Sequence, residues 1–205
     1  MPTWPRPDSA GTGKERPRPA ERSWGKLYAT LLTNTEPIGA LPASPSWECW
    51  RAGRAEGPLI GGVINRIVLA QATPFALPLE CFDGAVLFWE EAGGQAPYVW
   101  NYLQILRHSG ILDRIAGMVV GVPEAIDGLD SPDGSPSLAE IVLDVLGDRD
   151  IPILGNFEVG HAGPNLPMPV GIRVALDAAE KTLSLLEPVV HARGDGTGRV
   201  SAADQ

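Results

Sequence analysis

The chain has 205 residues, of which 16 are Lys or Arg and 25 are Asp or Glu, so its formal net charge is −9. This length suits one moderately sized core, and the acidic excess disfavours a nucleic-acid partner, because binding to the phosphate backbone needs a basic face. No stretch reaches the roughly 18 consecutive apolar residues of a bilayer span, and the first residues lack the apolar core of a signal peptide. We therefore expect no membrane association and a cytoplasmic location.

The two ends of the chain differ in composition from its middle. Residues 1–25 mix prolines with arginines and offer almost no aliphatic side chain to bury, so they are predicted to be a disordered Pro/Arg-rich tail. A proline-rich ligand for an aromatic groove is the alternative interpretation of this segment. Residues 191–205 are rich in Gly, Asp and Ser and are predicted to be a flexible tail.

The first local signal in the middle of the chain is Gly57-Pro58-Leu59-Ile60-Gly61-Gly62, followed by the apolar segment 63–71. This pattern predicts a glycine turn that leads into a helix N-terminus, where a phosphate can bind. The segment lacks the Lys-Ser/Thr of a P-loop and the G-x-G-x-x-G of a dinucleotide site. Close packing of the backbone at a domain edge is therefore the favoured use of these glycines.

Apolar runs and amphipathic segments alternate after this point. The run 85–89 is continuously apolar and stops at Glu90, which is typical of a strand covered on both faces. Ser135 is expected to cap a helix that Gly147 ends. Helices are predicted over 97–109 and 136–146, and further strands over 115–120, 151–157, 172–176 and 183–186.

This order of elements predicts an α/β fold. Strands joined through helices by short links are typical of parallel pairing with crossover helices. The last two strands are separated only by 177–181, so they are predicted to form a C-terminal antiparallel hairpin.

Two side chains follow predicted strands at the ends where α/β proteins place their working groups. Glu90 follows the strand at 85–89, and His161 follows the strand at 151–157. A carboxylate that contacts an imidazole fixes its tautomer and stabilises the imidazolium, as the acid of a catalytic triad does. The alternative is a solvated strand end for Glu90 and a structural loop histidine for His161.

Other reactive side chains give weaker signals. His108 lies in the last turn of its helix and is expected to interact with the helix dipole. Cys49 and Cys81 are too few for a disulfide framework, and no metal-ligand spacing occurs, so no metal and no cofactor are expected. No serine lies in a G-x-S-x-G elbow, so the chain shows a base and its orienting acid without a nucleophile.

Several motifs in one order carry a resemblance to a known family. From about Glu56 to Val189 the sequence resembles the C-terminal half of the LD-carboxypeptidase family of serine peptidases, most closely the branch of the microcin C immunity peptidases. The matching stretches are Glu56-Gly57-Pro58-Leu59-Ile60-Gly61-Gly62, Ala85 to Glu91, Gly110-Ile111-Leu112-Asp113-Arg114-Ile115-Ala116-Gly117, Ile151-Pro152-Ile153-Leu154, Gly160-His161 and Leu166-Pro167-Met168-Pro169-Val170-Gly171.

The resemblance implies a swivelling β/β/α domain over 56–190, preceded by a segment at 26–55 that is similar to an interdomain linker. It implies that His161 deprotonates a serine and later protonates the leaving amine, while Glu90 holds the imidazole. The implied substrate is a peptide or peptide-like amide, such as a murein tetrapeptide or a peptidyl-nucleotide. The family also allows a homodimer.

In the family the nucleophilic serine belongs to an N-terminal domain, which this sequence does not show. We therefore expect the isolated chain to be inactive unless a nucleophile-bearing N-terminal domain is supplied. The alternatives are a non-catalytic binding module and a truncated fragment that retains the fold. A truncated fragment would expose apolar surface, for which Trp47, Trp50 and Trp89 are candidates, although a core location is an equal alternative for each.

Overall fold

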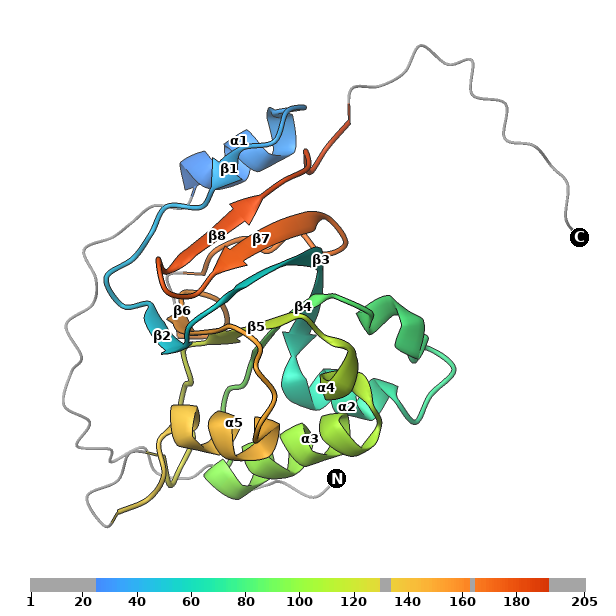
Figure 1. Ribbon diagram of the computed structural model, residues 1–205. Coiled ribbons are helices and arrows are strands. Elements are labelled where there is room, and N and C mark those ends of the chain that lie inside the picture. Colours follow the sequence, from blue (N-terminus) through green and yellow to red (C-terminus); the bar gives the residue numbers. More distant parts are fainter. Residues whose placement is uncertain (1–24, 130–133, 163–164, 192–205) are drawn as a thin grey trace, which may run out of the picture.

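The computed structural model describes residues 25–129, 134–162 and 165–191, which form three layers (Figure 1). An antiparallel sheet packs on a parallel sheet, and helices cover the other face of the parallel sheet. The predicted α/β class, with parallel strands joined by helices and a C-terminal hairpin, is confirmed. Nearly all of the two predicted tails falls outside the described ranges.

In the described ranges the strands are hydrogen-bonded in one continuous series, in the order β1-β8-β7-β3-β4-β5-β6-β2, and β3 is shared by the antiparallel and the parallel sheet. Their bounds are β1 Gly39–Ala40, β2 Glu48–Arg51, β3 Arg54–Val63, β4 Val86–Glu90, β5 Gly117–Gly121, β6 Ile153–Phe157, β7 Arg173–Asp177 and β8 Thr182–Leu185. The helices are α1 Gly25–Thr33, α2 Ile64–Ala70, the 3-10 helix η1 Leu79–Phe82, α3 Ala96–His108, α4 Ile111–Arg114 and α5 Leu138–Leu146. Each helix in the described ranges is too short or too polar to cross a membrane.

Strand β3 joins the two sheets. Its first half, 54–58, pairs antiparallel with β7, and its second half, 59–63, pairs parallel with β4. The predicted glycine turn at 57–62 is therefore wrong, because these residues lie inside a strand that has a partner on each side. Close backbone packing is confirmed, although in a central strand and not at a domain edge: a Cβ on Gly57 or Gly61 would collide with the carbonyl oxygen of a residue on the neighbouring segment.

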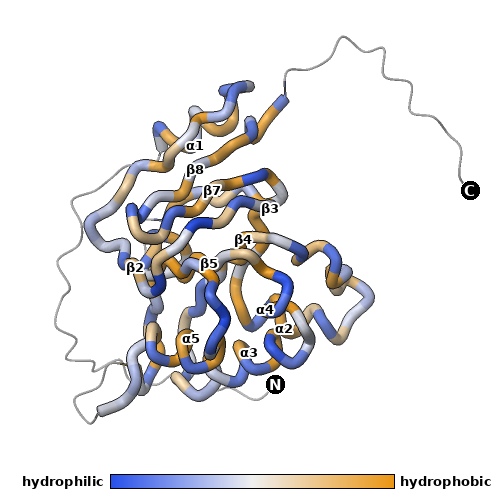
Figure 2. The backbone as a smooth tube through the Cα atoms, viewed as in Figure 1, coloured by the Kyte–Doolittle hydropathy of each residue, from blue (hydrophilic) through white to orange (hydrophobic). Residues whose placement is uncertain are grey.

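Each face of the parallel sheet covers one hydrophobic cluster. The alternation along β4, whose hydrophobic stretch is orange in Figure 2, sends Leu87 and Trp89 to the cluster under the helices. Val86 and Phe88 point into the cluster between the two sheets. Trp89 is thus a core residue, and the alternative that it lies on an exposed interdomain surface is wrong.

The segment 26–55, expected to be similar to a linker, contributes helix α1 and the edge strands β1 and β2. Trp47 is fully buried in the cluster between the sheets, while Trp50 is partly buried on the helix side. Strand β2 pairs antiparallel with β6, so this segment covers one edge of the parallel sheet.

Helix α5 begins two residues later than the capping residue Ser135 predicts. Its N-cap is Ser137, which accepts a hydrogen bond from the backbone of Glu140, while the Glu140 carboxylate accepts one from the backbone of Ser137. This reciprocal capping box satisfies two backbone donors that a cap at Ser135 would leave unpaired. Gly147 ends the helix as predicted.

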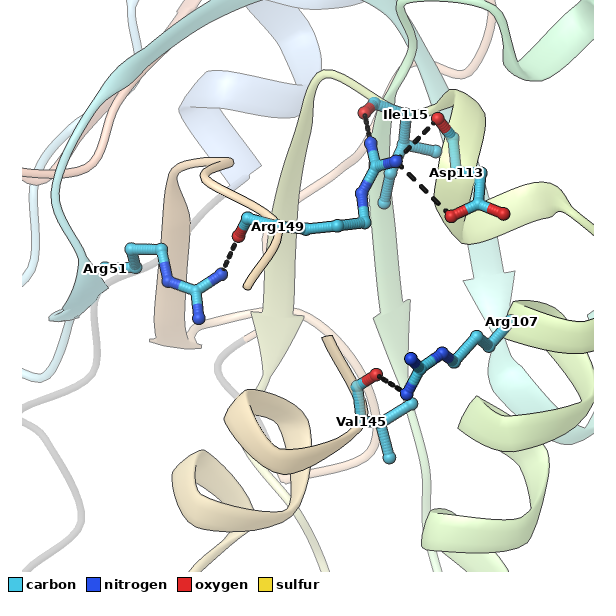
Figure 3. A network of polar contacts seen from close by, with 6 residues as sticks. All are labelled: Arg51, Arg107, Asp113, Ile115, Val145 and Arg149. Atoms are coloured by element: carbon cyan, nitrogen blue, oxygen red, sulfur yellow. Dashed lines mark hydrogen bonds and ion pairs between the residues drawn. The ribbon is translucent and has the colours of Figure 1, made fainter. Parts of the chain in front are cut away.

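Three arginines hold the segment between α5 and β6 in place (Figure 3). Arg107 of α3 donates to the Val145 carbonyl at 2.9 Å, and Arg51 of β2 donates to the Arg149 carbonyl. The Arg149 guanidinium donates to the Ile115 carbonyl at 3.1 Å, just before β5. These bonds satisfy carbonyls at a helix end and in a loop, and they fix the start of the strand that leads to His161.

Candidate active site

Glu90 is the last residue of β4, and its carboxylate is buried. The alternation along the strand places this side chain on the face between the two sheets, where the cluster that contains Phe88 ends. Glu91 lies on the opposite face and contacts the start of α2. The adjacent carboxylates of Glu90 and Glu91 therefore lie on opposite faces of the sheet.

His161 lies in the turn that follows β6. The pairing of β5 with β6 shifts in register between Val119 and Gly121, and Asn156 has a φ of 51°, so the end of β6 is bulged. The chain then places His161 Nδ1 2.9 Å from Oε2 of Glu90. The two residues predicted from the sequence are thus brought together at the carboxyl ends of β4 and β6.

The turn can approach the carboxylate because Gly160 has no side chain. Its φ is 115°, and a Cβ at this position would lie 2.7 Å from Oε2 of Glu90. A Cβ on Gly121 of β5 would lie 2.5 Å from the Val159 carbonyl oxygen and 2.7 Å from Cβ of Glu90. Both glycines are required by close approach, and Gly160 also by its backbone conformation.

The pair is asymmetric in exposure. The His161 side chain is 60% exposed and the Glu90 side chain is 6% exposed. Among the described residues, Glu90 is the only hydrogen-bond partner of the imidazole. A neutral ring that donates from Nδ1 to the carboxylate keeps Nε2 as its proton acceptor.

The carboxylate also makes the imidazole more basic. The hydrogen bond from His161 to Glu90 is the main cause of a raised pKa of the imidazole, and the negative charge of Glu90 adds to it. Glu124 and Glu91 raise this pKa further, while burial lowers it. The site therefore favours the imidazolium that forms when the ring accepts a proton.

Glu91 was not singled out by the sequence analysis, although it directly follows Glu90. Its carboxylate accepts hydrogen bonds from the Asn65 backbone at 3.2 Å and from the Asn65 side chain at 2.8 Å, at the start of α2. Burial raises the pKa of Glu91, and the Asn65 bonds oppose that rise. A pocket of about 310 Å³ lies on this face, lined by Asn65, 91–95, Tyr98, Val99 and Tyr102.

Glu158 is a second buried acid that the sequence analysis did not single out. It is the first residue after β6 and is 5% exposed. Its Oε1 accepts hydrogen bonds from the hydroxyls of Ser44 and Ser46. The sequence carries one sign of this buried acid, since Glu158 lies between the apolar residues Phe157 and Val159 at the end of a strand.

The remaining candidates do not join this site. His108 is the last residue of α3, the helix end where a cation interacts favourably with the dipole. No three His, Cys, Asp or Glu side chains within 25–129, 134–162 and 165–191 gather as metal ligands. In these same ranges no serine, threonine or cysteine bonds the imidazole.

The fold and the pair define a class: a β/β/α domain that presents an imidazole and its orienting carboxylate at the carboxyl ends of parallel strands. Residues 56–176, more than half of the chain, match the LD-carboxypeptidase C-terminal domain. The chain belongs to the LD-carboxypeptidase family.

Individual relatives agree with this assignment. The chain is 26% identical over 136 residues to the microcin C7 self-immunity protein MccF of Escherichia coli, covering 66% of this chain and 38% of MccF. It is 30% identical over 160 residues to a probable murein peptide carboxypeptidase of Bacillus subtilis (strain 168), covering 76% of this chain and 47% of that protein. The chain thus spans about half or less of the length of these curated relatives.

Solved structures show the same fold. MccF in an inactive mutant apo state aligns with a TM-score of 0.71 at 21% identity, covering 81% of this chain and 55% of the MccF chain. MccF in complex with glutamyl sulfamoyl guanosine aligns with a TM-score of 0.62 at 25% identity, covering 70% and 42%.

Proposed function

We propose that this chain supplies the general base and its orienting acid to amide hydrolysis of the LD-carboxypeptidase type. The observation that carries the proposal is the 2.9 Å contact between His161 Nδ1 and Glu90 Oε2. The buried carboxylate holds the exposed ring by one nitrogen and leaves the other free for proton transfer.

The roles follow from the proton balance of the reaction. Nε2 of His161 takes the proton of a serine hydroxyl as the oxygen attacks the carbonyl carbon of the scissile amide. The imidazolium, stabilised by Glu90, then gives this proton to the leaving amine as the amide bond breaks. Water releases the acyl group from the serine in a second cycle through the same base.

The serine belongs, in this proposal, to the part of the relatives' length that this chain does not span. Support comes from the exposure of His161, which leaves the ring accessible to a hydroxyl from another segment or another polypeptide. The location of the pair at the sheet edge places it where a second domain can meet it.

The names of the relatives suggest the substrate class. One is described as a murein peptide carboxypeptidase, and MccF binds glutamyl sulfamoyl guanosine. We assign to this chain a peptide or peptidyl-nucleotide substrate in which the amide bond to the C-terminal residue or group is hydrolysed.

Hydrolysis of a murein tetrapeptide and of a peptidyl-adenylate, followed by mass spectrometry, tests the proposal. The purified chain is assayed with and without a nucleophile-bearing N-terminal domain from a family member. We expect turnover only in the combined sample, its loss in His161→Ala and Glu90→Ala, and its retention in the control His108→Ala, which alters a helix end. Turnover that survives both site variants would refute the assignment, and ligand binding without hydrolysis would favour a binding module.

A further inference from the structure

We propose that Glu158, anchored by Ser44 and Ser46, is a positioning residue that holds the His161 turn against Glu90. This positioning role rests on the proposed function, because the place of the turn matters for catalysis only if His161 acts as the base. It concerns residues other than Glu90 and His161. Ser44 and Ser46 also lie outside the segment 56–176 that matches the family.

The anchor consists of two hydroxyls on one carboxylate oxygen. Oε1 of Glu158 accepts a hydrogen bond from Ser44 Oγ and a second from Ser46 Oγ at 3.3 Å. The two serine oxygens lie 2.9 Å apart; since Ser44 gives its one proton to Glu158, the one proton of Ser46 is shared between Ser44 Oγ and Glu158 Oε1. Ser44 and Glu158 are both buried, so water competes little for these bonds.

A ring contact beside the anchor strengthens the attachment. Trp47 stacks on Phe157 with a centroid distance of 4.3 Å and an interplanar angle of 27°. Both rings are fully buried in the cluster between the sheets. We call Ser44, Ser46 and Trp47 the clasp, since these residues hold the two positions at which β6 ends and the turn begins.

Glu158 is also the point at which the turn closes. The Leu166 backbone N–H donates to the Glu158 carbonyl at 2.7 Å, and the Gly160 N–H donates to the Asn165 side chain at 3.1 Å. The clasp therefore holds the base of a closed loop that carries His161. Because the imidazole is mostly exposed, its distance from Glu90 depends on where this loop lies.

The choice of residue supports positioning over packing. A buried carboxylate costs free energy that an apolar side chain of similar size would not, so packing alone does not explain a glutamate here. A carboxylate bonded to two hydroxyls fixes a direction as well as a location. This directional hold suits a turn whose histidine must stay within hydrogen-bond distance of another strand.

The test is an NMR titration of the three histidines in the full chain, with His161 assigned by its loss in His161→Ala. The double variant Ser44→Ala/Ser46→Ala keeps Glu90, Glu91 and Glu124, the carboxylates that raise the His161 pKa, so a change in this pKa reports a change in geometry. We expect this pKa to fall toward the ordinary value, though less far than in Glu90→Gln, which removes the main cause of the raised value. The amides of Gly160 and Leu166 are expected to exchange faster with solvent.

The matched control is Ser137→Ala, which removes another serine–glutamate hydrogen bond, that of the α5 cap. It should leave the His161 titration unchanged. If the double variant does not fold, the single variants Ser44→Ala and Ser46→Ala supply the test, because each removes one hydroxyl and keeps the Glu158 carboxylate. The smaller downward shift expected there serves the same purpose.

Each outcome separates the two proposals. A folded Ser44→Ala/Ser46→Ala variant with an unchanged His161 titration and unchanged amide exchange overturns the positioning role, provided that Glu90→Gln lowers the His161 pKa. A Glu90→Gln variant with no effect on His161 overturns the pair, and with it the proposed function. In an assembled active enzyme, the Ser44→Ala/Ser46→Ala variant should show a kcat about 10- to 100-fold lower with little change in KM, because a misplaced catalytic group slows the reaction more than it weakens binding.

Discussion

Replacing Gly160 by alanine is expected to break the contact between His161 and Glu90 while the fold survives. The new Cβ would lie 2.7 Å from Oε2 of Glu90, whereas ordinary contacts of a Cβ begin near 3.4 Å. If the buried Glu90 side chain keeps its place, the turn retreats by about 0.7 Å, the difference between these distances. If the imidazole retreats with it, the bond from Nδ1 lengthens from 2.9 Å to about 3.6 Å, which is no longer a hydrogen bond.

Gly171→Ala is the matched control. Gly171 has a φ of 95° and no atom within 4 Å of its missing Cβ, so this variant carries the backbone strain without the collision. Strain of this kind costs roughly 1–3 kcal/mol of stability. Both variants should therefore unfold at lower urea concentration, and only Gly160→Ala should change the His161 site.

The assay is an NMR titration of His161 together with urea unfolding of each variant. We expect the raised pKa of His161 to fall in Gly160→Ala and to remain raised in Gly171→Ala, because the Glu90 hydrogen bond is its main cause. A Gly160→Ala variant that titrates like the unmodified chain would show that the turn does not depend on this glycine for its approach to Glu90.

Three further outcomes are expected. Because the His161 pKa is raised in the folded state, its stabilising contribution is complete below the ordinary value of 6.5 and is lost as the pH rises through the raised value. The urea midpoints of the unmodified chain and His161→Gln should therefore converge at high pH, and a constant difference would contradict the linkage. Ser137→Ala removes the α5 capping box and should cost about 1 kcal/mol in urea unfolding; a cost near zero would mean that the cap does not stabilise the fold. Trp47→Ala should cost about 3–5 kcal/mol, because Trp47 is fully buried, and a cost typical of a surface site would place 26–55 outside the cooperative unit.

The sequence predicted the strands and helices whose apolar pattern is local. The run that became β4 is apolar on both faces because clusters cover both, and this is visible without coordinates. Strand β3 was missed because Gly57, Pro58 and Gly61 favour turns in isolation. Pairing with β7 and β4, which lie far along the chain, overrides that local preference.

The candidate site divides in the same way. Glu90 and His161 could be predicted because topology places the ends of parallel strands at one edge. The contact of Ser44 with Glu158 could not, since it joins residues 114 positions apart and no local pattern marks a serine as the partner of a buried acid. The capping residue of α5 was misplaced by two positions because Ser135 and Ser137 are both acceptable caps, and only Ser137 has a glutamate three residues later.

The layered fold also determines the direction from which the site can be used. The side chain of Glu90 lies on the face between the two sheets, where the turn that carries Gly160 and His161 covers its carboxylate and shields it from water. Its charge is screened little and acts mainly on the imidazole that contacts it. The ring itself remains mostly exposed, so any hydroxyl or amide that it serves must approach from the solvent side of the turn. Residues that hold the turn, rather than residues around the substrate, therefore set the distance on which the basicity of His161 depends.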